Sequence, residues 1–244
     1  PEKIGRESTL SKQIRYGLKY MALISIEQTN FERVIKLGFA KKPGDEISKF
    51  LIFELMGKHS NVFYLDNKYK IIAVGKQIKL SQSSFRTIAT GNTYSEPPTN
   101  LKKKPTENES FQSWRDSISM IPESLKFCLI NTYQGVSPIL TKQLAIISDI
   151  SDPEIMEKNI DFISEANLKA IFKSWITWIN RFNNNKFNFS TFGGSFYCVW
   201  FLDKEICCKN KIDLCTGLEN YYEYHLNQKK IESLLRKIDG IIFK

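Results

Sequence analysis

The stretch FLIFELMGKHSNVFYLD, residues 50–66, holds the pattern that decides the fold. Two apolar runs in it flank a short polar group that begins at Gly57 and ends at Asn61. Apolar and polar residues alternate in the runs, which is typical of strands. Because Gly57 tolerates the backbone angles of a sharp turn, a strand turning there would place Lys58, His59 and Asn61 on one rim. These side chains could fix the turn or contact a ligand, and the sequence leaves both interpretations open.

The alternation continues on both sides of this stretch, over residues 23–94, and DNK at 66–68 suits a tight turn between strands. A helix-like segment with a basic face precedes it at residues 9–22. Residues 91–110 carry three prolines and three consecutive lysines, which favours a linker. We therefore predict a small antiparallel β domain over residues 1–100.

Short segments with helix-like caps follow at residues 109–118, 123–133, 137–147, 152–160 and 165–182. Ser137-Pro138 and Asp152-Pro153 each join a capping residue to a proline suited to the first helical position. Five short helices in this span predict a helix-hairpin-helix-like domain over residues 101–182.

The last part of the chain returns to a β pattern at residues 183–213 and then to a helical one at 214–244. The β pattern predicts a hairpin or a small sheet. Apolar residues recur along the helix at helical spacing, which predicts an amphipathic helix that starts a coiled coil. They are Leu218, Tyr221, Tyr222, Leu226, Ile231, Leu234, Leu235 and Ile238. The predicted fold class is thus α+β.

Charge and cysteine content narrow the class of protein. The 244 residues include 35 basic and 26 acidic ones, a net charge of +9. This balance favours nucleic acid first and an acidic membrane second as partner, and the alternative is a basic protein whose charge only keeps it in solution. Five cysteines without a C-x-x-C pair indicate buried reduced thiols, so we expect a cytoplasmic protein. No apolar run reaches the ~18–20 residues of a membrane span, so we expect no membrane partner.

The residues favour a binding module over an enzyme, and we expect no catalytic residue, cofactor or metal. GKHS at 57–60 is similar to the end of a phosphate-binding loop, but position 52 is Ile where that loop requires Gly. The two histidines, His59 and His225, lie far apart in the sequence, which argues against a histidine-rich metal site. No G-x-S-x-G motif occurs.

A charged pair, Glu32-Arg33, interrupts the strand pattern FERVIKL at residues 31–37. In a strand, Phe31, Arg33 and Ile35 would share one face. A charge on a buried face must be paired or must face a ligand. An outward ion pair and a contact of Arg33 with a phosphate or a base edge are both compatible with this pattern.

Three strings resemble the N-terminal domain of the NFACT family, the bacterial fibronectin-binding-protein-A-like or RqcH proteins with eukaryotic ribosome quality-control relatives. They are residues 26–39, 50–66 and 85–98. The family pattern reads roughly Q-x-x-x-D-R, then E-L/I-M-G-R-H-S-N, then R-x-x-x-x-G-x-x-Y-x-x-P-P. This chain supplies Gln28, Glu32-Arg33, Glu54 to Asn61, Arg86, Gly91, Tyr94 and Pro97-Pro98. YQGVSPILTKQLA and LENYYEYHLNQKKIESL resemble the helix-hairpin-helix segment and the coiled-coil entry of the family, so the resemblance covers about residues 10–238.

The resemblance implies a function in ribosome quality control. Family members bind a large ribosomal subunit, with its rRNA, obstructed by peptidyl-tRNA. They recruit tRNA, alanine tRNA in bacteria, and promote template-free C-terminal tailing of the stalled chain. The resemblance also implies further residues before Pro1 and after Lys244, among them a long coiled coil and a C-terminal RNA-binding domain.

The family assigns tRNA recruitment to an Asp-Arg pair, and the matching residues here are Glu32 and Arg33. Glu in place of Asp is a departure that keeps the charge and adds a methylene group. The tRNA-binding residues that we expect from the match and the basic pattern are Glu32, Arg33, Lys36, Lys58, His59, Asn61 and Arg86.

Two rival functions follow from the same resemblance. The N-terminal domain of the family is said to resemble that of formamidopyrimidine-DNA glycosylases, which use an N-terminal Pro-Glu, and this chain begins Pro1-Glu2. Those enzymes carry a four-cysteine zinc finger, for which this chain lacks a C-x-x-C pair. The second rival is a fibronectin-binding surface adhesin, which the unpaired cysteines and the absence of an L-P-x-T-G motif disfavour.

Overall fold

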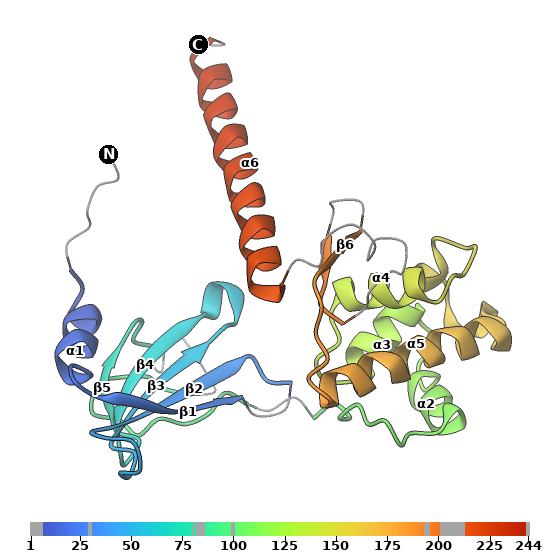
Figure 1. Ribbon diagram of the computed structural model, residues 1–244. Helices are drawn as coiled ribbons and strands as arrows, with labels where there is room; N and C mark the ends of the chain where they lie inside the picture. Colours follow the sequence, from blue (N-terminus) through green and yellow to red (C-terminus); the bar gives the residue numbers. More distant parts are fainter. Residues whose placement is uncertain are drawn as a thin grey trace. The chain divides into compact units, whose positions relative to one another are not determined.

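The computed structural model describes residues 7–28, 31–79, 81, 86–98, 101–192, 196–200 and 213–242. The chain divides into two units, Pro1–Leu101 and Lys102–Lys244, which we call the β unit and the helical unit. Figure 1 shows a sheet in the first and a group of helices in the second. The predicted α+β class is therefore confirmed, and the likeness to glycosylase N-terminal domains stays a prediction.

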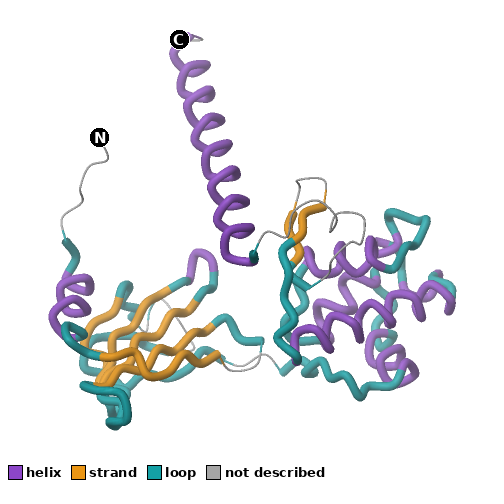
Figure 2. The backbone as a smooth tube through the Cα atoms, viewed as in Figure 1, coloured by secondary structure: helices purple, strands orange, loops and turns teal. Residues whose placement is uncertain are grey.

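The β unit contains an antiparallel sheet whose five strands have the same order in space as in the chain. They are β1 (Ala22–Gln28), β2 (Val34–Ala40), β3 (Lys49–Glu54), β4 (Asn61–Asp66) and β5 (Ile71–Val74). The helix α1 (Thr9–Gly17) precedes them, and the Oγ of Ser8 caps it by accepting a hydrogen bond from the Ser11 amide at 3.1 Å. Figure 2 shows the strands in orange with loops between them.

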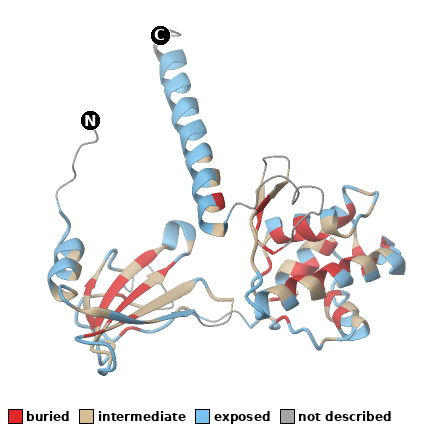
Figure 3. Cartoon of the chain, in the orientation of Figure 1, coloured by how far each residue is buried: buried red, intermediate tan, exposed pale blue. Residues whose placement is uncertain are grey.

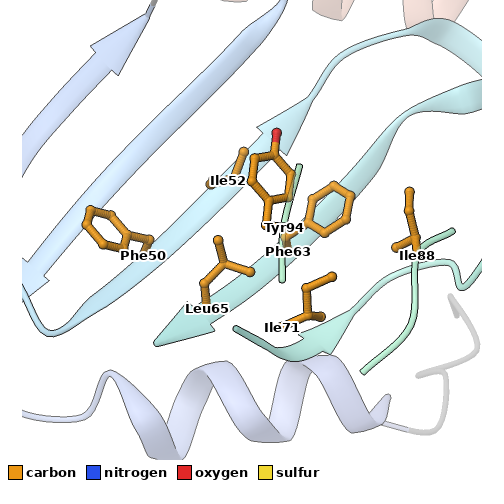
Figure 4. Packing of buried hydrophobic residues seen from close by; sticks show 7 residues of the cluster. All are labelled: Phe50, Ile52, Phe63, Leu65, Ile71, Ile88 and Tyr94. Carbon is orange, nitrogen blue, oxygen red and sulfur yellow. The ribbon is translucent and has the colours of Figure 1, made fainter. Parts of the chain in front are cut away.

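Alternation places successive side chains on opposite faces of the sheet, which gives the unit two apolar layers. Register pairs Ile52 with Phe63 and Phe50 with Leu65 on one face. These four pack with Ile71, Ile88 and Tyr94 into the cluster of Figure 4. The other face carries a smaller buried group, Leu51, Tyr64 and Ala73, which Leu10 and Ile14 of α1 and the following Leu18 pack against.

β1 forms an edge of the sheet, since it pairs with β2 and with no other strand among the described residues. The register between β1 and β2 shifts between Leu23 and Ser25, which marks a bulge. Leu23 and Ile26 are 48% and 69% exposed. This edge therefore combines apolar side chains with backbone groups that the described residues do not use.

The stretch predicted as a linker, residues 91–110, forms backbone hydrogen bonds with the β unit near its start and with the helical unit further on. Gly91 donates to the Ile71 carbonyl, and Tyr94 donates to the Tyr69 carbonyl, each at 2.8 Å. Lys103 donates to the Thr132 carbonyl at 2.8 Å in the helical unit. The boundary between the two units falls within this stretch, after Leu101, and the parts on either side are held by backbone hydrogen bonds that proline and polar composition does not reveal.

The helical unit contains four of the five predicted helices: α2 (Phe111–Ile118), α3 (Leu125–Thr132), α4 (Pro138–Ile147) and α5 (Glu165–Asn183). A serine caps each of them, namely Ser110, Ser124, Ser137 and Ser164. Trp114, Tyr133 and Trp175 are fully buried between the helices, and Figure 3 shows this buried interior in red.

The helix predicted over residues 152–160 is wrong. This part forms two single 3-10 turns, η2 (Ile155–Glu157) and η3 (Ile160–Phe162). Asn159 lies between them in extended conformation and forms a bridge with Ser124, while its Oδ1 caps η3 through the Asp161 amide. Pairing with α3 thus overrides the local helical pattern.

A hairpin and a long helix complete the helical unit. β6 (Ser190–Phe192) pairs with β7 (Phe196–Cys198), which confirms the predicted hairpin, and predicted β residues 201–212 lie outside the described residues. α6 runs over Leu214–Ile242, so the predicted helix is confirmed. Figure 3 shows most of α6 in pale blue, and its apolar Ile231, Leu234 and Ile238 are about half exposed.

Candidate nucleic-acid interface

One end of the sheet brings several predicted site residues together. β2 begins, β3 ends and β4 begins at this end, because neighbouring strands are antiparallel. Glu32 and Arg33 precede β2, and the 3-10 turn η1 (Gly57–His59) joins β3 to β4. The Leu55 amide donates to the Arg33 carbonyl at 2.8 Å, which ties the two segments together. We call Glu32, Arg33, Lys58 and His59 the rim.

The turn at the rim requires glycine at position 57. Gly57 has φ +58°, a left-handed conformation in which other residues are strained. Two backbone hydrogen bonds close the turn, from His59 to Met56 and from Ser60 to Gly57, and the Ser60 Oγ accepts from the Met56 amide at 2.9 Å. The side chains of Lys58 and His59 consequently project from a fixed backbone.

Three side chains of the rim are available to a partner. Arg33, Lys58 and His59 are exposed, and Figure 3 shows the η1 turn in pale blue. Within the residues that the structure describes, their side chains have no hydrogen-bond or ion-pair partner. The interpretation of Arg33 as part of an outward ion pair is therefore not what the structure shows. The exposed, unpaired charges of Arg33 and Lys58 on one edge suit contact with phosphates.

Asn61 follows the rim in the chain, but its side chain is only 6% exposed. Its Nδ2 donates to the Lys76 carbonyl at 2.8 Å, and its Oδ1 accepts from the amides of Lys76 at 2.8 Å and Val62 at 3.0 Å. These bonds fasten the start of β4 to the residues after β5. Asn61 therefore departs from the expectation that it shares the rim, because the sheet uses its polar atoms.

Arg86 also departs from the expected place on an RNA-facing surface. Its Nη1 donates to Oε1 of Glu54 at 2.8 Å, and its Nη2 pairs with the second oxygen of the same carboxylate. Glu54 is 1% exposed and accepts a further hydrogen bond from the Tyr94 hydroxyl at 2.9 Å. The guanidinium thus serves to neutralise a buried carboxylate.

Burial and the Glu54 charge shift the pKa values of Tyr94 and Arg86. Burial raises the pKa of Tyr94 above its ordinary value, and the neighbouring Glu54 charge raises it further. Burial alone would lower the pKa of Arg86, but the hydrogen bond and charge of Glu54 outweigh it and the pKa is raised. Tyr94 therefore stays a neutral donor and Arg86 a cation at any physiological pH.

A pocket of about 230 Å³ adjoins the rim within the β unit. Three carboxylates line it: Glu27 on β1, Glu32 on the rim and Glu96 on the segment after Tyr94. Its apolar and aromatic walls come from Val34, Ile52, Tyr69, Tyr94 and Pro97. Figure 4 shows the ring of Tyr94 beside Ile52 and Phe63 with its hydroxyl directed away from Ile71. Glu32 therefore lines the pocket, whereas the neighbouring Arg33 is exposed outside it.

Lys36 supplies the positive charge of the pocket. Its Nζ lies 2.8 Å from the Glu27 carboxylate and 3.2 Å from the Tyr69 hydroxyl. The hydrogen bond with Lys36 lowers the pKa of Glu27, and the hydrogen bond with Glu27 raises the pKa of Lys36. The predicted Lys36 therefore lines the pocket and is not part of the exposed rim.

The sequence did not identify Glu27, Tyr69 and Glu96 as site residues. They come from three separate segments, so no spacing in the sequence joins them. Tyr94 belonged to the matched pattern without a role. Among the residues that the structure describes, no group of three or more His, Cys, Asp or Glu side chains could hold a metal ion. No helix in the described ranges is long and apolar enough to cross a membrane.

Comparison with known proteins agrees with the resemblance. The family model described as NFACT N-terminal and middle domains matches residues 1–242. Proteins named Rqc2 homolog RqcH are similar: that of Streptococcus pneumoniae D39 is 36% identical over 107 residues, 43% of this chain and 19% of the relative. That of Bacillus subtilis 168 is 31% identical over 121 residues, 48% of this chain and 21% of the relative. The matched part thus spans about a fifth of these relatives' length.

Two solved structures share the fold. The N-terminal part of the fibronectin/fibrinogen-binding protein of Streptococcus suis matches with a TM-score of 0.60 and 22% identity, over 89% of this chain and 73% of that chain. The fibrinogen-binding protein of Staphylococcus aureus matches with a TM-score of 0.56 and 22% identity, over 82% of this chain and 68% of that chain. At this identity the likeness concerns the fold alone.

Proposed function

The chain belongs to the NFACT family of ribosome quality control proteins, and on that premise we propose that its β unit binds tRNA through the rim and the adjoining pocket. One observation carries the proposal: Glu32 and Arg33, the residues that match the family's pair, divide between a pocket and an exposed cationic edge. Arg33, Lys58 and His59 would contact phosphates, which provide affinity without sequence preference.

The composition of the pocket favours an unstacked base as its occupant. Glu27 is paired with Lys36, and the remaining carboxylates, Glu32 and Glu96, repel a phosphate but accept hydrogen bonds from the amino groups of adenine, cytosine or guanine. The half-buried ring of Tyr69 is the kind of surface on which a base can stack. At about 230 Å³ the pocket is smaller than the roughly 300–1,000 Å³ of sites for drug-sized ligands, so it suits a single ring system.

Binding of total tRNA by this chain, followed by fluorescence anisotropy at several salt concentrations, tests the proposal. Arg33→Ala is expected to weaken binding by about tenfold and to reduce the slope of log affinity against log salt by about 1, as the loss of one phosphate contact would. The melting temperature should stay unchanged because Arg33 is exposed and unpaired.

Lys42→Ala is the matched control, since Lys42 is exposed on the turn between β2 and β3 at the opposite end of the sheet. It removes the same charge and is expected to affect binding little. If both variants lose tRNA affinity equally, the interaction depends on the net charge of the chain and not on the rim. Unchanged affinity for Arg33→Ala would remove the rim from the interface.

For the whole protein we propose, from family membership, action on obstructed large ribosomal subunits and recruitment of alanine tRNA for template-free C-terminal tailing. Purification of the protein from its own cells with sequencing of bound RNA tests this. Alanine tRNA together with large-subunit rRNA, and loss of the tRNA with Arg33→Ala, is the expected result. Fibronectin binding, the alternative, would instead give affinity for purified fibronectin that Arg33→Ala and nuclease treatment leave unchanged.

A further inference from the structure

A buried ion pair lies where the first apolar layer of the sheet meets the pocket. Glu54 ends β3 and is paired with Arg86, whose guanidinium lies 6.0 Å above the Phe63 ring. Tyr94 packs edge-on against Phe63, with 4.9 Å between ring centroids, and donates to Glu54. Two side chains of the stretch 86–98 therefore meet at one carboxylate on β3.

Stability alone does not account for this arrangement. Removing a carboxylate and a guanidinium from water carries a penalty that their attraction roughly offsets, and well-packed apolar residues in place of such pairs are often as stable. Unlike an apolar contact, a hydrogen-bonded ion pair also constrains the orientation of its two side chains. The planar fork of Arg86 has one orientation when both of its ends pair with Glu54.

The oriented guanidinium of Arg86 also holds the backbone that forms one wall of the pocket. Its Nη1 also donates to the Ser95 carbonyl at 2.6 Å. The neighbours of Ser95, Tyr94 and Glu96, both line the pocket, as does Pro97. The Tyr94 amide, held by the Tyr69 carbonyl at 2.8 Å, anchors the start of this segment. Residues 94–97, which we call the wall segment, are thus held by their backbone at both Tyr94 and Ser95.

We propose that Glu54 and Arg86 are positioning residues that fix the wall segment, and through Glu96 determine which base edge the pocket accepts. The nature of the ligand rests on the proposed function, whereas the fixing of the wall concerns this chain alone. Glu32 and Glu96 reach the pocket from different segments, so a shift of the wall segment changes the separation of the two acceptors.

An apolar replacement separates positioning from stability. Glu54→Met and Arg86→Met with Tyr94→Phe remove both charges and the hydroxyl that would lose its acceptor, while roughly keeping side-chain volume. Arg86→Lys is the second variant, because it keeps the charge but cannot pair at two points. Leu51→Ala is the control for lost stability, since Leu51 is buried on the other face of the sheet, in the group that α1 covers.

Two measurements test the proposal. The first is exchange of the backbone amide at position 94 without RNA, expected to be about five- to tenfold faster in the apolar and Arg86→Lys variants, as for a weakened hydrogen bond. The second is the ratio of affinities for short oligoadenylate and oligouridylate, since uracil lacks an amino group. The wild-type preference for oligoadenylate is expected to fall by a factor of about three or more in these variants, the scale of a weakened base contact, and to persist in Leu51→Ala.

The outcomes keep the two proposals apart. Folded apolar and Arg86→Lys variants with wild-type exchange at Tyr94 would overturn the positioning role, whatever the RNA result. Faster exchange with an unchanged preference would overturn the link to specificity. If the wild-type chain binds neither tRNA nor oligonucleotide, the proposed function fails, while exchange at Tyr94 still decides whether Glu54 and Arg86 fix the wall.

Discussion

Replacement of Asn61 by alanine tests whether this residue of the matched string holds the sheet or contacts RNA. The side chain makes three hydrogen bonds, with the Lys76 carbonyl, the Lys76 amide and the Val62 amide. Alanine cannot replace any of them, and the partners lie in a partly buried region. We therefore expect Asn61→Ala to destabilise the β unit and to leave the RNA affinity of the folded protein unchanged.

The magnitude follows from the count of hydrogen bonds. At about 0.5–1.5 kcal/mol each, three bonds give a loss of about 1.5–4.5 kcal/mol, centred near 3. With a urea dependence of about 1.5 kcal/mol per M, a loss of about 3 kcal/mol lowers the urea midpoint by about 2 M. A domain with an unfolding free energy of about 5–15 kcal/mol stays folded in water after such a loss or lies near its limit.

The assay must follow the β unit by itself. All four tryptophans lie in the helical unit, so backbone amide signals of β4 and β5 are the suitable probe, and tryptophan fluorescence is the internal control. Asn67→Ala is the matched variant, because Asn67 is exposed on the turn before β5, and its free energy of unfolding should stay within about 0.5 kcal/mol of wild type.

Two results would refute this reasoning about Asn61. A wild-type midpoint for Asn61→Ala would mean that the three hydrogen bonds contribute nothing net. A normal midpoint together with weakened tRNA binding would return Asn61 to the RNA interface that the sequence suggested.

Two further predictions concern Tyr94 and the base of α6. Since its folded-state pKa is raised above the ordinary 10.0, Tyr94 stabilises the β unit fully below pH 10 and loses that contribution as the pH rises further. The urea midpoint of wild type should fall more steeply above pH 10 than that of Tyr94→Phe, and equal slopes would contradict this. In Gly217→Ala the new Cβ would lie 2.3 Å from Cγ of Phe189, so amide exchange in the first turn of α6 should quicken despite a helix-propensity gain of about 1 kcal/mol. Gly240→Ala, with open space around it, should instead slow exchange in the last turns, and faster exchange there would show that the contact at Phe189 is not the cause.

The sequence predicted the sheet because each strand leaves its own signature. Alternation in residues 50–66 is a local property, and the structure places β3 and β4 there with the turn at Gly57. The capping serines behaved in the same way, since Ser137 needs only its own helix to act. Residues 152–160 failed because their conformation depends on Ser124, about thirty positions away.

The candidate site was predictable only in part, for a related reason. Arg33, Lys58 and His59 are exposed as expected, and nothing more than a strand end is needed to expose them. Arg86 belonged to the same matched pattern, but its place is set by Glu54, 32 residues earlier. A polar residue that pairs inside the protein and one that contacts a partner look the same in a sequence. Only the residues around each of them in the folded chain distinguish the two.

The exposed edge of β1 affects how the β unit behaves in concentrated solution. An edge strand with open hydrogen-bonding groups and apolar side chains such as Leu23 and Ile26 is a template on which another strand can form. The bulge between Leu23 and Ser25 breaks the regular spacing of those groups, so an incoming strand matches them over only a few residues. We therefore expect any self-association through this edge to be weak and to depend on protein concentration, so that dilution should keep the protein monodisperse.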